Sequence, residues 1–292
     1  MRIDSHIHTG LGGDYPTASA FDRAKFMGDL RSAGIDGAVI LSADPLKCGR
    51  KMGPSERMQD TLAICRGEEN LFPFYWINPL EDGAAEQVQQ AVDAGFDGFK
   101  MICSNYYPGC NQSMDVLQKI AESGKPVLFH SGICWDGMNS ADYNRPGNFE
   151  ALIEIPKLRF ALAHISWPWC DECIAVYGKF NNAYYMRPET SCEMFIDVTP
   201  GTPRGYREDV FRYLFGSCYE FRYNLMFGSD CSTSKYNAAW SREWQDRDDM
   251  LYERFVEEDV EDFKEHVYCK NVMRFMGKSD EKIQKKVPMV AE

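Results

Sequence analysis

The sequence predicts an α/β fold of the TIM-barrel type, in which eight parallel strands alternate with helices. Short apolar runs and segments of helical periodicity alternate about eight times over the chain, which is typical of parallel βαβ units. The runs are apolar on both faces, as strands of a parallel sheet should be. No glycine-rich phosphate loop follows the first run, so a doubly wound open sheet is the second choice. Because no low-complexity linker divides the chain, we expect residues 1–292 to form a single domain.

The expected strands are apolar runs that end at turn-forming or polar residues. The first strand begins with Arg2-Ile3-Asp4 and leads into His6-Ile7-His8. The other expected strands cover residues 37–41, 71–77, 96–102, 126–130, 158–164, 183–186 and 224–227.

The expected helices carry apolar residues at helical spacing, and several end at a glycine. Phe21, Ala24, Met27 and Leu30 form such a stripe, which Gly34 ends. The expected helices cover residues 19–33, 57–66, 84–94, 113–122, 148–155, 170–180 and 207–215, followed by a mainly helical remainder from residue 238.

Charge and composition exclude several classes of protein. Acidic residues (44) outnumber basic ones (32), and the formal net charge of -12 would repel a nucleic-acid backbone. The chain has no apolar run of membrane-spanning length and no secretory leader pattern. Its eleven cysteines are scattered and odd in number, which favours free thiols in a reducing cytoplasm. The one CxxC pattern, Cys170 to Cys173, begins an expected helix, and we expect it to be structural.

Two histidines end the first expected strand. Side chains alternate along a strand, so His6 and His8 point to the same face and can reach one point in space. Neutral imidazole is the commonest metal ligand in proteins, which makes a metal site one interpretation of this pair. A buried hydrogen-bonded pair is the other.

Further polar side chains follow later strands. In a barrel, the carboxyl ends of all strands share one rim, where active sites form. His266 is the one histidine of the five that lies elsewhere, in a helical region, and we expect it to be structural or exposed. The residues at expected strand ends are His6, His8, Lys100, His130, His164 and Asp230.

This set favours a divalent metal, most simply one zinc ion held by three imidazoles and a carboxylate. A bound metal lowers the pKa of water toward neutrality and so makes hydroxide available. Asp230 could contact the metal and also accept a proton from that water. His164 could lie just outside the ligands and act as a proton carrier, or it could be a fourth imidazole ligand.

The motifs around these residues resemble the amidohydrolase superfamily over nearly the whole chain. The likeness rests on IDSHIH, GFDGFKM, PVLFH, LAHIS and LMFGSD, together with the closing segment NVMRFMG. It is strongest for the branch that includes aminocarboxymuconate-semialdehyde decarboxylase and several predicted metal-dependent hydrolases. The resemblance implies a distorted (β/α)8 barrel with four metal ligands: His6, His8, His130 and Asp230.

The resemblance also bears on two further residues. It implies that His164 is catalytic in members with one metal and binds a second metal in the others. Lys100 stands where two-metal relatives carry a carboxylated lysine that bridges the ions, but lysine is often unmodified in this branch, so we expect one metal. Relatives often continue with Leu-His-Pro, whereas residues 101–104 read MICS here, so no function of that histidine is expected.

Residues after the strands could contact a substrate. Trp135 and Trp167 could wall a pocket for a planar substrate, and Arg187, on or after the seventh strand, could bind a carboxylate. Aromatic rings packed under loops and a solvated arginine are the alternatives. The same alternatives, substrate contact or a structural or solvated position, apply to Trp169, Arg204, Lys235 and Tyr236. Glu189 is expected to be solvated.

These observations predict a metal-dependent hydrolase that acts on an amide, lactone or ester bond of a small molecule. The resemblance also implies an alternative within the same site, a non-oxidative decarboxylase of an aromatic or dienoic acid. A barrel that binds a ligand without catalysis is a third possibility. The expected partner is a small-molecule substrate, with a homodimer as one option for assembly.

Overall fold

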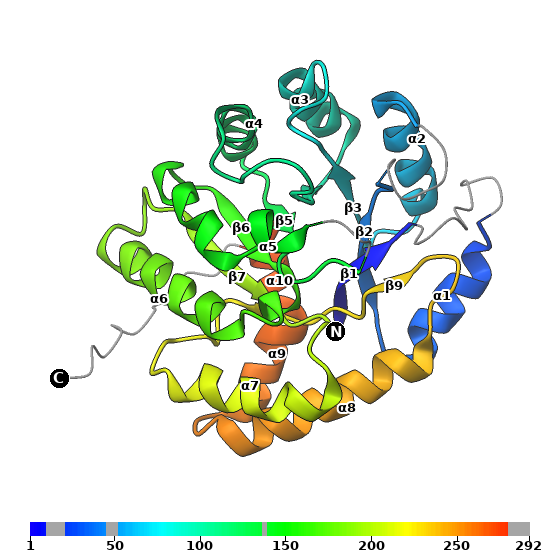
Figure 1. Cartoon of the computed structure of the whole chain (residues 1–292). Helices are drawn as coiled ribbons and strands as arrows, with labels where there is room; N and C mark the ends of the chain where they lie inside the picture. The colour runs from blue at the N-terminus through cyan, green and yellow to red at the C-terminus, as the bar shows by residue number, and fades with distance from the viewer. Residues whose placement is uncertain (10–20, 45–51, 136–138, 280–292) are drawn as a thin grey trace.

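A computed structural model of the protein describes residues 1–9, 21–44, 52–135 and 139–279. Across these residues the strands form one sheet in the order β8-β7-β6-β5-β4-β3-β2-β1-β9, and every neighbouring pair is parallel. Helices surround the sheet (Figure 1). The strands are β1 (Ile3–His8), β2 (Gly37–Leu41), β3 (Leu71–Trp76), β4 (Gly98–Met101), β5 (Val127–Phe129), β6 (Arg159–Leu162), β7 (Glu193–Asp197), β8 (Leu225–Met226) and β9 (Cys231–Ser232).

Helices connect successive strands, as parallel pairing requires. Most of the connecting helices are amphipathic and bury one side against the strands. The helices are α1 (Arg23–Ser32), α2 (Pro54–Cys65), α3 (Ala84–Ala94), α4 (Asn111–Glu122), α5 (Ser140–Tyr143), η2 (Pro146–Glu154), η3 (Ala163–Ser166), α6 (Cys170–Met186), α7 (Arg204–Gly216), α8 (Ala238–Phe255), α9 (Val260–Glu265), η4 (His266–Lys270) and α10 (Asn271–Phe275). None of the helices in the described ranges combines the length and the apolar character that crossing a membrane requires.

The sheet closes on itself at β1. The backbone N–H of Ser5 donates to the carbonyl of Phe227, and β9 pairs with β1 in parallel. β8 and β9 are thus two pieces of an eighth strand, interrupted by residues 227–230. The TIM-barrel fold expected from the sequence is confirmed.

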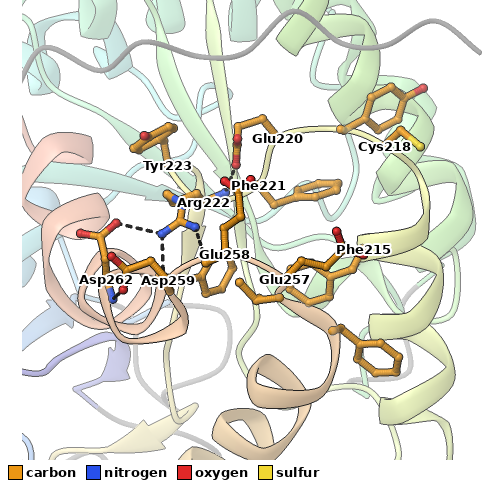
Figure 2. Close-up of a pocket in the computed structure, with 14 residues that line it drawn as sticks. Phe215, Cys218, Glu220, Phe221, Arg222, Tyr223, Glu257, Glu258, Asp259 and Asp262 are labelled. Carbon is orange, nitrogen blue, oxygen red and sulfur yellow. Dashed lines mark hydrogen bonds and ion pairs between the residues drawn. The ribbon is translucent and has the colours of Figure 1, made fainter.

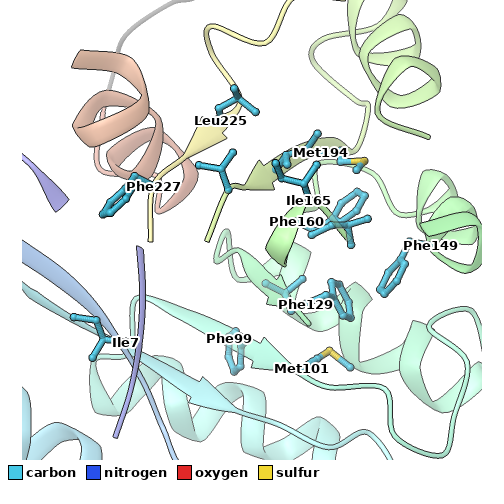
Figure 3. Packing of buried hydrophobic residues seen from close by; sticks show 14 of the residues in the cluster. Ile7, Phe99, Met101, Phe129, Phe149, Phe160, Ile165, Met194, Leu225 and Phe227 are labelled. Carbon is cyan, nitrogen blue, oxygen red and sulfur yellow. The ribbon is translucent and has the colours of Figure 1, made fainter. Parts of the chain in front are cut away.

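Two apolar layers hold this barrel together. The larger layer lies between the strands and the surrounding helices, and Figure 3 shows part of it, including Phe99, Phe129 and Phe160. The smaller layer fills the inside of the barrel near the amino ends of the strands. There, Phe275 of α10 packs its ring 5.0 Å from that of Phe195 and 6.2 Å from that of Phe74. α10 therefore plugs one end of the barrel, and the carboxyl ends of the strands are left for the polar residues.

The expected strand at residues 183–186 is wrong. These residues form the last turn of α6, and the true seventh strand is Glu193–Asp197, which is wholly buried. Tyr185 and Met186 are 39% and 68% exposed, whereas a strand in this barrel is buried on both faces. A short apolar aromatic run does not distinguish a strand from the end of a helix, which is why the pattern misled.

The other expected elements are confirmed, most of them to within a few residues, although the helix expected at 170–180 continues to Met186. The strand at 37–41 and the helix at 84–94 have the expected bounds, and the expected helix at 148–155 is the 3-10 helix η2. Residues 19 and 20 of the first expected helix, and residues 280–292 of the helical remainder, lie outside the described residues.

Replacing the plug residue should destabilise the barrel. We expect Phe275→Ala to lower the free energy of unfolding by about 3–5 kcal/mol, because it removes a buried ring and leaves a cavity. Tyr213→Ala is the control, since this side chain is 60% exposed and its loss should cost about 0.5 kcal/mol or less. Urea unfolding measures both variants, and equal effects would contradict the role of α10 as a plug.

Candidate metal centre

The two histidines of β1 face the inside of the barrel and point to one place. Their Nε2 atoms lie 3.2 Å apart. Oδ1 of Asp230, from the interrupted eighth strand, lies 3.2 Å from Nε2 of His8 and 3.7 Å from Nε2 of His6. Three of the predicted ligands therefore converge, although Asp230 lies more than 220 positions along the chain from the two histidines.

His164 joins this group from the end of β6. The potential ligand atoms of His6, His164 and Asp230 all lie within 4.8 Å of one another. Among the described residues, the buried Nδ1 of His164 has no hydrogen-bond partner. The backbone turns sharply here, with φ of 63° at His164, and the ring packs directly against Gly201. A Cβ at Gly201 would come within 2.7 Å of the His164 Cβ, so only glycine leaves room for this ring.

The charges in the centre suit cation binding. Burial, followed by the nearby Lys100 ammonium group, holds the pKa of His6 well below its usual value, and burial lowers the pKa of His8. Burial opposes ionisation of Asp230, but the hydrogen bond from His8 and the other imidazoles outweigh it and hold the Asp230 pKa below its usual value. Neutral imidazoles beside an ionised carboxylate are the protonation states in which these groups bind metals.

Lys100 and His130 also line the centre. Lys100 is buried on the inward face of β4, and its Nζ lies 3.3 Å from Nε2 of His6. His130 follows β5, and its ring centroid lies 5.0 Å from that of His164. His130 thus adjoins the cluster through His164, whereas His164 itself has a potential ligand atom within 4.8 Å of those of His6 and Asp230. The sequence prediction of His130 as a ligand stays a prediction.

Asp197 is a site residue that the sequence interpretation missed. It ends β7, is wholly buried, and its Oδ2 lies 2.6 Å from Nδ1 of His6. The missed signal is the run Met194-Phe195-Ile196-Asp197, an apolar strand that ends in a carboxylate. With the seventh strand placed at 183–186, Asp197 fell in an expected loop.

The aromatic residues expected at the mouth have different environments. Trp135 is 88% exposed. Trp167 is half-buried with its ring 5.0 Å from that of Tyr206, and Trp169 lies under the guanidinium group of Arg145. Substrate contact by Trp135 and Trp167 stays a prediction.

Arg187 is not on or after the seventh strand, and that placement is wrong. It is the exposed C-terminal cap of α6. Because α6 leads from the carboxyl end of β6 back to the amino end of β7, Arg187 lies at the edge of the barrel opposite the histidines. The prediction that Arg187 binds a substrate carboxylate depended on a position at the end of the seventh strand, and Arg187 does not have that position.

Other residues singled out in the sequence have structural partners or solvent around them. Arg204 pairs with Glu243 at 2.7 Å, and the Tyr236 hydroxyl donates to Asp4 at 3.0 Å. Lys235 and Glu189 are exposed. His266 is buried, with Nδ1 3.2 Å from Oδ1 of Asn271, as a structural histidine would be.

The CxxC pattern is structural in this fold. Cys170 and Cys173 are free, buried thiols at the start of α6. Burial raises the pKa of each thiol to about 12, so neither forms a thiolate near neutral pH.

A hollow of about 640 Å³ lies away from the histidines (Figure 2). It is lined by the end of α7 and the connection from α7 to β8, which lies at the amino edge of the strands, and by the connection between α8 and α9 with the residues beside it. Arg222 crosses it and donates to Asp262 and to the carbonyls of Glu258 and Asp259. These contacts of Arg222 join the two connections. None of the predicted site residues lines the hollow.

The donor set of the histidine cluster fits a divalent transition metal. His6 and His8 offer imidazole nitrogens and Asp230 offers a carboxylate oxygen, and the imidazoles of His164 and His130 lie next to them. These are the ligand types that zinc and its neighbours take. The buried Nδ1 of His164, which no described group satisfies, is a further sign that the cluster has a polar occupant.

The sequence profile of one family, described as amidohydrolase, matches residues 3–277. The chain therefore belongs to the amidohydrolase family, and it is an enzyme of the amidohydrolase type, for which a divalent metal is typical. None of the curated proteins compared with the chain matches it.

Solved structures with the same fold include proteins of different activity. An uncharacterised TIM-barrel protein of Bordetella bronchiseptica has a TM-score of 0.67 and 14% identity, over 95% of this chain and 98% of its own. A probable 2-pyrone-4,6-dicarboxylic acid hydrolase of Acinetobacter baumannii has a TM-score of 0.61 and 12% identity, over 94% and 99%. A manganese-bound 5-carboxyvanillate decarboxylase of Novosphingobium aromaticivorans has a TM-score of 0.62 and 11% identity, over 95% and 96%. At these identities the likeness confirms the barrel fold alone.

Filling the space beside His164 should disturb the centre. We expect Gly201→Ala to lower the free energy of unfolding by about 1–3 kcal/mol, because the new methyl group overlaps the His164 side chain. Gly205→Ala is the matched control, since a Cβ there meets nothing within 4 Å. Thermal unfolding of both variants measures the difference, and a Gly201→Ala protein as stable as the control would contradict the packing described here.

Proposed function

We propose that this protein is a hydrolase that uses one divalent metal, with zinc preferred, to cleave an amide, lactone or ester bond of a small molecule. The observation that carries the proposal is the position of Asp230. Its ionised carboxylate stands beside two imidazoles of β1 and a third from the end of β6, at the rim where barrel enzymes place their active sites.

In this proposal His6, His8, His130 and Asp230 hold the ion. When bound, the ion supplies Lewis-acid activation of water and of the scissile carbonyl group. Zinc suits a set of imidazoles with one carboxylate. Manganese is the alternative, because a structural relative is described with manganese bound.

In this proposal Asp230 and His164 carry out different proton transfers. Asp230 accepts a proton from the attacking water, for which its lowered pKa keeps it ionised near neutral pH. His164 lies close to Asp230, and its unpartnered Nδ1 is available to hydrogen-bond a substrate oxygen or to carry a proton to the leaving group. The His164 side chain is buried, whereas that of Asp230 is 35% exposed and so can be reached by water.

Decarboxylation of an aromatic or dienoic acid is the second candidate function. One structural relative is described as a decarboxylase of an aromatic acid, and another as a probable hydrolase. The two reactions leave different products. A panel of amides, lactones, esters and aromatic acids, analysed for carbon dioxide and for incorporation of ¹⁸O from water, distinguishes them.

The remaining expectations accompany this proposal. We infer that the partner is a small-molecule substrate, that residues 1–292 act as one domain, and that the enzyme assembles as a monomer or a homodimer. Its free buried thiols suit a reducing compartment such as the cytoplasm.

Removing the proton acceptor tests the proposed chemistry. We expect Asp230→Asn to reduce kcat/KM by at least about 100-fold on any substrate found, because the amide cannot accept a proton. Asp246→Asn, an exposed change on α8, is the control and should retain activity. Near-normal turnover of a folded Asp230→Asn enzyme would refute the hydrolytic role.

The two histidines beyond β1 can be separated by metal content. We expect His130→Gln to lose most of the metal bound per chain, because it removes a ligand, and His164→Gln to retain the metal but lose turnover. Elemental analysis of the purified variants, beside the wild-type protein, measures both metal identity and stoichiometry. Loss of metal in His164→Gln with retention in His130→Gln would reverse the two assignments.

A further inference from the structure

We propose that Asp197 is a positioning residue of the metal centre, which sets the tautomer and ring orientation of His6. The inference deepens the proposed function and rests on its metal site. It concerns a residue of β7 that does not itself belong to the group of potential ligands in the centre.

The contact between the two side chains is short and fully buried. Oδ2 of Asp197 lies 2.6 Å from Nδ1 of His6, and the side chains are 0% and 1% exposed. A carboxylate can only accept, so Nδ1 of His6 carries the proton and donates it. The lone pair of His6 is then on Nε2, the atom that faces His8 and Asp230.

This tautomer is the one that a metal between β1 and Asp230 requires. With the proton on Nε2 instead, His6 would point an N–H group at the other ligands and could not coordinate. Carboxylates that bond the second nitrogen of a ligating histidine commonly orient the ring and raise its basicity as a ligand.

Asp197 is itself held in place by Thr199. The backbone N–H of Thr199 donates to Oδ1 of Asp197 at 2.7 Å, and its hydroxyl group donates to the same oxygen. The carboxylate therefore accepts on both oxygens. An asparagine could not satisfy this pattern, since one end of its amide is a donor and would face either Thr199 or His6.

The segment that leads to Asp230 packs onto this pair. A Cβ at Gly228 would lie 2.2 Å from Oγ1 of Thr199 and 2.7 Å from the Cβ of His6, so the chain passes here only as glycine. Asp197, Thr199 and His6 thus form a buried unit against which the eighth strand rests. A reorientation of the Asp197 carboxylate would therefore change its hydrogen bond to the ring of His6.

The test compares Asp197→Asn with the wild-type protein in two measurements. In the metal-free protein, ¹H–¹⁵N long-range NMR spectra of the histidine rings report the tautomer, and we expect His6 to lose its Nδ1–H form in the variant. In a chelator competition with Zn²⁺ and with Mn²⁺, we expect about 10–100-fold weaker binding.

Two threonine variants of one loop provide the matched controls. Thr199→Val removes one hydrogen bond to Asp197, and we expect a smaller loss of metal affinity of about threefold to tenfold, in the same direction. Thr202→Val removes a buried hydroxyl group that has no hydrogen-bond partner among the described residues, and we expect it to change neither measurement. If Asp197→Asn does not fold, the comparison of the two threonine variants decides the matter.

The outcomes separate this inference from the proposed function. An unchanged His6 tautomer and metal affinity within about twofold of wild type in Asp197→Asn would overturn the role of Asp197. Equal losses in Thr199→Val and Thr202→Val would overturn it as well. A wild-type protein that binds neither ion would instead refute the proposed function, while the tautomer measurement on metal-free protein would still test Asp197.

Discussion

The backbone pairing between β1 and residues 227–233 is the constraint on which the metal centre depends. The N–H groups of Ser5, Asp230 and Thr233 join the two segments, and the bond from Asp230 to the His6 carbonyl is 3.1 Å long. This pairing closes the barrel and in the same step places the Asp230 carboxylate beside both histidines of β1. Because the bonds are made by the main chain, the closeness of these ligands does not depend on their own attraction.

A buried carboxylate below the histidines strengthens this junction. Asp4 accepts from the N–H groups of His6 and Ser229 through one oxygen and from the Tyr236 hydroxyl through the other. Burial raises the pKa of Asp4 to about 6, and its hydrogen bonds oppose that rise. Asp4 thus links β1 to the residues on either side of Asp230, just as Asp197 links β1 to β7.

The alternation of side chains along the strands separates the apolar layer inside the barrel, here called the apolar floor, from the polar residues of the metal centre. On β7, Phe195 packs against the plug residue Phe275, and Asp197, two positions later, contacts His6. On β5, Leu128 belongs to the apolar floor, and His130 follows two positions later. Successive inward positions therefore pass from an apolar layer to a polar one, which explains why the centre forms at a single end.

The sequence by itself determined the barrel, the strand-end positions of His6, His8, His130, His164, Lys100 and Asp230, and the chemistry such groups share, because periodicity and strand ends are local patterns. Only the tertiary structure decided that His164 lies beside His6 and Asp230 and that Asp197 bonds His6. It also decided that residues 183–186 end a helix, which places Arg187 at the far edge of the barrel. Those facts depend on which strands become neighbours and on which nitrogen of a ring faces which partner. Such relations arise between segments distant along the chain, where local pattern carries no information.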